Sequence, residues 1–147
     1  MQTVCLIGKP NVGKSSIFNR LIKEKKAIIM DTPGITRDRI YGIVNYNKKR
    51  FSLIDTGGIS LGNDNFDKDI IAQAQLAIDE ADLILFVVDG LLDIDATDIY
   101  IKDMLHKANK KVIVVVNKLD NNKRLDNLYN FYELGFSEVI GVSAEHN

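Results

Sequence analysis

The sequence contains little of what several protein classes require. Its single cysteine, Cys5, excludes an internal disulfide framework, and the apolar run around it predicts a buried, unreactive thiol. No apolar run approaches the ~18 residues that a membrane-spanning helix needs. The N-terminus lacks the apolar segment and cleavage site of a signal peptide. The net charge of −1 predicts no strong overall attraction to polyanions. These absences favour a soluble, cytoplasmic protein with no membrane partner.

The length and the residue pattern favour one α/β domain. The chain has 147 residues, 46% of them hydrophobic, which is enough for one domain with a substantial core. Short β-rich segments alternate with segments of helical periodicity, as is typical of a mostly parallel sheet with helices on both faces. We expect six strands, over 3–7, 39–46, 50–54, 83–88, 112–116 and 138–142, and helices over 14–23, 66–81, 95–108 and 124–134.

The segments between these elements refine the expected fold. Residues 47–49 are few enough for a hairpin, which would make strands 39–46 and 50–54 antiparallel at one sheet edge. Residues 24–38 are expected to be irregular. Asp95 is a predicted N-cap, and Gly135 stands where a left-handed C-terminal cap belongs. The alternation requires one more helix after the last strand, so we expect a single domain over 1–147 that is truncated before that helix.

Residues 8–15, GKPNVGKS, match the phosphate-loop pattern G-x-x-x-x-G-K-S in full. They follow a predicted strand and open a predicted helix, so backbone N–H groups and the helix N-terminus would face a phosphate group. Lys14 is expected to reach the β- and γ-phosphates, and the Ser15 hydroxyl to bind Mg²⁺. The alternative is an ordinary glycine-containing turn between a strand and a helix. The pattern alone does not distinguish ATP from GTP.

Residues 117–120, NKLD, follow a predicted buried strand and suggest a guanine site. The Asp120 carboxylate can accept hydrogen bonds from guanine N1–H and the N2 amine, whereas adenine would leave it unpaired. Asn117 would link the base site to the phosphate loop, and the Lys118 stem can cover the purine face. Further along the chain, the Ala144 N–H could bond guanine O6. The alternative for residues 117–120 is a simple turn at a strand end.

Two Asp-x-x-Gly segments compete for the role of magnesium-binding strand end, at residues 31–34 and 55–58. We assign Asp55, because it directly follows the clear strand at 51–54. Gly58 N–H would then sense the γ-phosphate. Asp89 ends another apolar strand, and we interpret it as part of a turn with Gly90. The loop at 31–38 is left as the switch, with Thr36 as its Mg²⁺ ligand. The alternative for Thr36 is a capping role.

Six segments together, GKPNVGKSSIFNRL, DTPGITRDRIYG, LIDTGG, LFVVDG, NKLD and SAEH, resemble the Der (EngA) family of bacterial ribosome-assembly GTPases along essentially the whole chain. The resemblance implies a P-loop NTPase fold of the small-GTPase kind. Family members carry two GTPase domains and a KH-like domain, and this chain is similar to the first GTPase domain only. The implied partners are ribosomal RNA or the large ribosomal subunit, and other domains of a longer chain.

The resemblance also implies properties of two single positions. In related GTPases, an asparagine at the place of Asn11 helps to bind K⁺ beside the phosphates, although Asn11 could simply form a turn. Ile59 stands where many small GTPases place a water-orienting glutamine, so slow intrinsic GTP hydrolysis is expected. A nucleotide-gated binding module with little hydrolysis is therefore the alternative function. Related tRNA-modifying or membrane-associated GTPases are disfavoured by Asp-Thr-Gly-Gly at residues 55–58.

The predicted site combines these assignments. The guanine nucleotide, GTP or GDP, is expected to contact Gly8, Lys9, Pro10, Asn11, Val12, Gly13, Lys14, Ser15, Ser16, Asp55, Thr56, Gly57, Gly58, Ile59, Asn117, Lys118, Leu119, Asp120, Ser143 and Ala144. Catalysis is expected to depend on Lys14, Thr36, Gly58 and Asn11. The metal ligands are expected to be Ser15, Thr36 and Asp55 for Mg²⁺ and Asn11 for K⁺.

Overall fold

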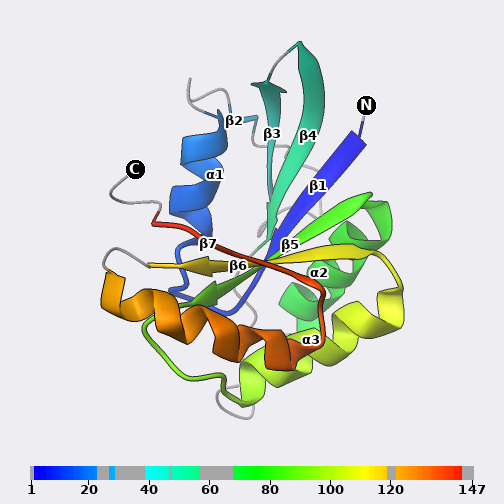
Figure 1. Ribbon diagram of the computed structural model, residues 1–147. Helices are drawn as coiled ribbons and strands as arrows, with labels where there is room; N and C mark the ends of the chain where they lie inside the picture. The colour runs from blue at the N-terminus through cyan, green and yellow to red at the C-terminus, as the bar shows by residue number, and fades with distance from the viewer. Residues whose placement is uncertain are drawn as a thin grey trace.

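The computed structural model describes residues 2–22, 27–28, 39–46, 48–56, 68–118 and 122–143. In this part of the chain, strands and helices largely alternate (Figure 1). Their order is β1 (Gln2–Ile7), α1 (Lys14–Ile22), β2 (Ala27–Ile28), β3 (Arg39–Tyr46), β4 (Lys49–Thr56), α2 (Lys68–Glu80), β5 (Leu83–Asp89), α3 (Ala96–Ala108), β6 (Lys111–Asn117), the 3₁₀ helix η1 (Asn122–Leu134) and β7 (Glu138–Gly141).

The strands form one sheet in the order β2-β3-β4-β1-β5-β6-β7. The central pairs β4–β1, β1–β5, β5–β6 and β6–β7 are parallel. The hairpin β3–β4 and the short pair β2–β3 are antiparallel at one edge. The predicted α/β class, with a mostly parallel sheet and an antiparallel edge hairpin, is confirmed. The parallel strands also place their carboxyl ends along one side of the sheet, where ligands bind in open α/β folds.

Helices cover both faces of this sheet, as predicted. Alternate residues of β1 point to opposite faces: Leu6 packs in one cluster with Phe18 of α1, and Ile7 packs in the other cluster, with Ile78 of α2 and Ile101 of α3. Figure 1 shows α1 on one side of the sheet and α2 and α3 on the other. Complete burial of such side chains contributes about 1.5–3 kcal/mol each. The core therefore fixes the strand ends that carry the candidate site.

The structure differs from the expected elements in two places. Residues 24–38 were expected to be irregular, but Ala27–Ile28 pair with β3 as a seventh strand, too short to show an alternating pattern. The helix expected over 124–134 is a 3₁₀ helix. Its inward residues Leu128, Phe131 and Leu134 are three positions apart, which is the repeat of a 3₁₀ helix.

Several local predictions are confirmed. The Asp95 side chain caps α3 by accepting a hydrogen bond from Asp98 N at 3.0 Å. Gly135 adopts a left-handed φ of 83° just after η1. Cys5 is fully buried. None of the helices in the described part of the chain has the length and apolar character needed to span a bilayer.

Candidate functional site

The predicted motifs meet at the carboxyl ends of the parallel strands. The loop 8–15 leaves β1, and Asp55 lies near the end of the neighbouring strand β4, paired with Leu6. On the other side of β1, Asp89 at the end of β5 pairs in register with Asn117 at the end of β6. The alternation of strands and helices thus brings residues that are far apart in sequence to one edge of the sheet.

The shape of the phosphate loop explains its glycines. A Cβ on Gly8 would lie 2.6 Å from the Val87 carbonyl oxygen of β5, so only glycine lets the loop pass so close to the strand. Gly13 has a φ of 94°, and a Cβ there would overlap the Asn117 side-chain amide. Asn11 also has a left-handed φ, 69°, which asparagine tolerates better than most residues. Its role in the turn is therefore established by its backbone, whereas its role as a K⁺ ligand stays a prediction.

Lys14 and Asp55 form a buried pair of opposite charge beneath this loop. Lys14 begins α1 and is 8% exposed, and burial lowers the pKa of its amine, although the charge of Asp55 acts in the opposite direction. Burial raises the pKa of Asp55 to about 6, although the charge of Lys14 and a hydrogen bond from Ser15 lower it. Asp55 Oδ1 is buried and has no hydrogen-bond partner. The site thus holds a buried carboxylate oxygen that lacks a hydrogen-bond partner, as expected where a charged ligand binds.

These groups fit a Mg²⁺ ion carried in with a nucleotide. Mg²⁺ prefers oxygen ligands and is usually held by one or two protein groups together with phosphates. The Ser15 hydroxyl bonds the Asp55 carboxylate, so two suitable oxygens lie together at the start of α1. The described residues contain no cluster of three or more His, Cys, Asp or Glu side chains that could form an all-protein metal cage. The donor set therefore matches a metal shared with phosphate groups.

Two hydrogen bonds join the first two residues of the predicted guanine-binding loop, residues 117–120, to the phosphate loop. Asn117 is 2% exposed, and its Nδ2 donates to the Val12 carbonyl at 2.9 Å. Lys118 Nζ donates to the Asn11 carbonyl at 2.8 Å, from a residue whose φ is 70°. The predicted link between Asn117 and the phosphate loop is thus present. The spacing between a base site and a phosphate site would be fixed by these contacts.

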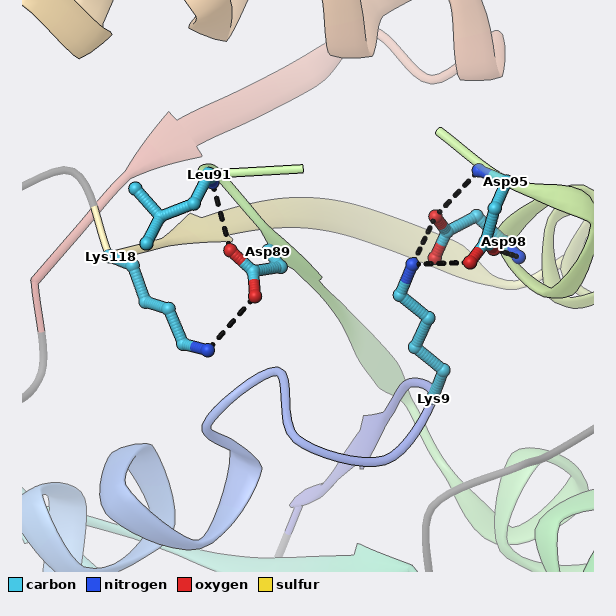
Figure 2. Close-up of polar contacts among 6 residues, drawn as sticks. All are labelled: Lys9, Asp89, Leu91, Asp95, Asp98 and Lys118. Carbon is cyan, nitrogen blue, oxygen red and sulfur yellow. Dashed lines mark hydrogen bonds and ion pairs between the residues drawn. The ribbon is translucent and has the colours of Figure 1, made fainter. Parts of the chain in front are cut away.

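Asp89 contributes a contact that the sequence did not indicate. The expected turn with Gly90 is present, since Asp89 Oδ1 accepts from Leu91 N at 2.8 Å. Its Oδ2 also lies 2.9 Å from Lys118 Nζ, forming an ion pair in which Asp89 is almost buried (Figure 2). One signal could have found this pair: Asp89 and Lys118 follow adjacent parallel strands, whose ends lie side by side.

Two further candidates have side chains engaged elsewhere. The Thr56 hydroxyl donates to the Leu6 carbonyl at 3.0 Å, so it joins β4 to β1 and is not free for a nucleotide. Lys9 turns toward the start of α3, where its Nζ lies 2.8 Å from Asp95 Oδ2 and 3.1 Å from Asp98 Oδ2 (Figure 2). Only the backbone of each remains available to a phosphate or a base. The pattern G-x-x-x-x-G-K-S leaves position 9 unspecified, so it contains no signal for this ion pair.

For three other predicted site residues the structure gives the position and the exposure only. Pro10 is exposed beside Asn11, and Ser16 and Ser143 are half-buried, at α1 and just after β7. Seven predicted site residues lie outside the described residues: Thr36, Gly57, Gly58, Ile59, Leu119, Asp120 and Ala144. Their roles stay predictions.

A phosphate loop hydrogen-bonded to the loop that carries Asn117, with Lys14 of α1 beside the buried Asp55 of β4, defines the nucleotide-binding domain of a P-loop GTPase. The chain belongs to the family of 50S ribosome-binding GTPases, whose sequence pattern matches residues 3–118.

The chain is similar to GTPases named Der from several bacteria. The GTPase Der of Mycoplasmopsis pulmonis is 49% identical over 143 residues, which cover 97% of this chain and 32% of that protein. The Der of Lacticaseibacillus casei is 47% identical over 99% of this chain and 34% of its own length. The resemblance to the Der family is thereby confirmed, and the chain spans about a third of the length of these relatives. Which of their domains it matches stays a prediction.

Solved structures of another GTPase share the fold. Aquifex aeolicus Era bound to GDP·AlF4⁻ superposes with a TM-score of 0.81 at 32% identity, covering 98% of this chain and 52% of that chain. Era in complex with MgGDPNP and a 16S ribosomal RNA fragment also gives a TM-score of 0.81, at 31% identity over 97% of this chain and 51% of that chain. The fold prediction of a small-GTPase-like P-loop domain is confirmed by these matches.

Proposed function

We propose that this domain binds GTP and GDP together with Mg²⁺, hydrolyses GTP slowly, and serves as a nucleotide-dependent switch in assembly of the large ribosomal subunit. The observation that carries the proposal is the Asn117–Val12 hydrogen bond of 2.9 Å, which joins the two motifs at one site. Each motif alone has a simple alternative as a turn. The two motifs lie together beside Lys14 and Asp55, and Asp55 Oδ1 lacks a hydrogen-bond partner. This arrangement suits a single ligand that has phosphate groups at one end and a base at the other.

Phosphate binding would rest on Lys14 and on the loop backbone. The N-terminus of α1 and the left-handed turn at Asn11 would direct backbone N–H groups of the loop toward the phosphate groups. Lys14 would gain phosphate oxygens as partners, which compensates for the burial that lowers the pKa of its amine. Ser15 and Asp55 would hold Mg²⁺, which neutralises phosphate charge when bound.

Hydrolysis would need residues on two segments that are proposed to change conformation with the γ-phosphate, residues 27–38 and 57–66. Thr36 and Gly58 are proposed to sense the γ-phosphate through their backbone N–H groups. Ile59 has no polar side-chain atom, so water must be oriented by backbone groups, by a cation beside Asn11 or by another domain. Slow turnover by the domain alone follows from this lack of a water-orienting side chain.

The decisive experiment is a phosphate-release assay on the purified protein with GTP and Mg²⁺, in KCl and in NaCl. Turnover above the rate of the protein-free solution, competed by GDP, supports the enzyme. Tight GTP binding with no turnover in either salt would contradict hydrolysis by this chain. It would favour the alternative, a nucleotide-gated module that docks to RNA or to a neighbouring domain.

Substitution of Asn11 with alanine tests the proposed potassium role. We expect turnover to be faster in KCl than in NaCl for the native protein, and Asn11→Ala to remove most of that difference. A glycine variant, Asn11→Gly, is the matched control, because it keeps the left-handed φ of 69° without strain while it also lacks the amide. Equal loss in both variants assigns the effect to the side chain. The same rate in both salts for the native protein would contradict the prediction.

The ribosomal role is proposed from the relatives. The family is described as binding the 50S subunit, and an Era structure holds a 16S ribosomal RNA fragment. Co-sedimentation of the full-length chain with ribosomal subunits, in the presence of GDP or a non-hydrolysable GTP analogue, tests this role. Binding to the large subunit in one nucleotide state only supports a switch. Equal binding in both states, or none, contradicts it.

The Asp89–Lys118 ion pair gives a prediction about nucleotide affinity. Asp89→Asn keeps the size of the side chain but removes the negative charge 2.9 Å from Lys118 Nζ. Lys118 would then cover the purine face less stably, and we expect GDP affinity to fall about tenfold, as for loss of one charged hydrogen bond. Asp103→Asn is the control, since Asp103 is exposed on α3 and pairs only with Lys102 at 3.4 Å among the ion pairs of the described residues. Unchanged GDP titration curves for Asp89→Asn would remove this role.

A further inference from the structure

Lys9 occupies a position in the phosphate loop that the proposed function does not explain. Lys9 is 8% exposed, and its side chain leaves the loop toward α3, away from Lys118 on the other side (Figure 2). Its Nζ bonds Asp95 at 2.8 Å and Asp98 at 3.1 Å, residues that follow it by 86 and 89 positions. The start of the loop is therefore attached to an element that carries no phosphate-binding motif.

Both carboxylates in this cluster already have a structural task. Asp95 Oδ1 accepts from Asp98 N at 3.0 Å, and Asp98 Oδ2 accepts from Asp95 N at 3.1 Å, which forms a reciprocal cap at the first turn of α3. The Lys9 ammonium bonds the remaining Asp95 oxygen and shares Asp98 Oδ2 with the cap. The cap therefore fixes the position of both acceptors, and through them the position of Lys9.

The cluster is costly to open because the Lys9 ammonium and the Asp98 carboxylate are buried, whereas Asp95 is half exposed. Asp98 is 2% exposed, and its Oδ1 has no partner, so its charge depends on Lys9 and the cap. Burial alone would lower the pKa of Lys9, but hydrogen bonds to Asp95 and Asp98 raise it. Burial raises the pKa of Asp98. Withdrawing Lys9 would leave an uncompensated buried carboxylate, an arrangement that proteins strongly disfavour.

We propose that Lys9 is a positioning residue, which holds the phosphate loop in its anion-binding shape through its ion pairs with Asp95 and Asp98 and so couples nucleotide affinity to the capped start of α3. The inference rests on the proposed nucleotide binding. Only Pro10 separates Lys9 from the left-handed turn at Asn11, so an anchored Lys9 limits the conformations open to the loop before a nucleotide binds. A loop that is shaped before binding loses less conformational entropy when the phosphate arrives.

The test compares three variants of the purified protein by calorimetric titration with Mg²⁺ and GDP. Lys9→Met keeps the length of the side chain but removes the charge, and GDP affinity should fall roughly tenfold. Lys9→Arg can bond both carboxylates and should bind GDP within about threefold of the native protein. Asp98→Asn keeps an acceptor for the α3 cap but removes the charge, and it should weaken GDP binding in the same direction as Lys9→Met.

A double variant separates positioning from direct contact. If Lys9 acts through Asp98, adding Asp98→Asn to Lys9→Met should weaken GDP binding by clearly less than the product of the two single effects. Multiplied effects, or no rescue by Lys9→Arg, would overturn the positioning role. So would native GDP affinity in Lys9→Met or, should that variant not fold, in Asp98→Asn. With GTP and Mg²⁺, Lys9→Met should raise KM by a larger factor than it lowers kcat, because a positioning role acts mainly on nucleotide binding.

The proposed function and the positioning role fail in different ways. If the native protein binds no guanine nucleotide, the proposed function is wrong. If the native protein binds GDP and the folded Lys9 and Asp98 variants bind it equally well, only the positioning role is wrong. Circular dichroism at the titration temperature establishes which variants are folded.

Discussion

Lys14→Met is expected to lower kcat/KM for GTP by roughly 10²–10³. Lys14 is the only lysine of the phosphate loop whose ammonium faces Asp55, because Lys9 is bonded to Asp95 and Asp98. Charge that develops on the transferred phosphate would lose its closest fixed cation. Methionine preserves the unbranched stem and its packing in the buried first turn of α1. A phosphate-release assay with GTP and Mg²⁺ measures the loss.

Lys111→Met is the matched control for this prediction. Lys111 is the first residue of β6, so it lies at the amino end of the strand, opposite the carboxyl ends that carry the site. It makes an exposed ion pair with Glu138 at 3.8 Å, and its removal should leave turnover unchanged. Burial lowers the pKa of Lys14, so its ammonium is poorly stabilised by the nucleotide-free protein. Lys14→Met should therefore remain folded, as thermal unfolding without nucleotide can show. A folded Lys14→Met protein with hydrolysis within threefold of native would contradict the assignment.

The parts of this molecule that could be predicted from sequence are those with a local pattern. Strands β5 and β6 each contain an unbroken apolar run, residues 83–88 and 112–116, and such runs indicate burial on both faces. The phosphate loop and the motif at residues 117–120 are short patterns, and each consists of residues that are consecutive in the sequence. The contact between Asn117 and Val12 could also be predicted, because two motifs for one ligand must lie within the length of that ligand.

The contacts that escaped prediction join polar residues with no periodic relation. The pairs Lys9–Asp98 and Asp89–Lys118 span 89 and 29 residues, and each depends on how one strand end meets the next element in space. Lysine and aspartate are usually exposed, so composition gives no reason to expect Lys9, Asp89 and Asp98 to be buried. Only the packed sheet shows that these charges lie on two sides of the phosphate loop (Figure 2). The phosphate loop itself could therefore be predicted from the sequence, whereas the ion pairs that hold it in place are known only from the structure.

Asp120→Asn is expected to change the base that the protein prefers. Guanine N1–H and the N2 amine would both lose the carboxylate acceptor, and GTP affinity should fall roughly 10²–10⁴-fold for two charged hydrogen bonds. Xanthine carries a carbonyl at C2, which can accept a hydrogen bond from the new amide, while the amide oxygen still accepts from N1–H. Affinity for xanthosine triphosphate should therefore rise. Competition of both triphosphates for a fluorescent nucleotide gives the two affinities.

The structure sharpens this prediction by separating base recognition from phosphate chemistry. Asn117 and Lys118 hold the phosphate loop through the Val12 and Asn11 carbonyls, and neither bond involves residue 120. Asp120→Asn should therefore hydrolyse bound xanthosine triphosphate with a kcat within about threefold of the native value with GTP, because the transition-state contacts are unchanged. Asn117→Ala is the contrasting variant, since it removes the bond to Val12 and should weaken both nucleotides alike. If Asp120→Asn kept native affinity for GTP, the assignment of the base site would be wrong.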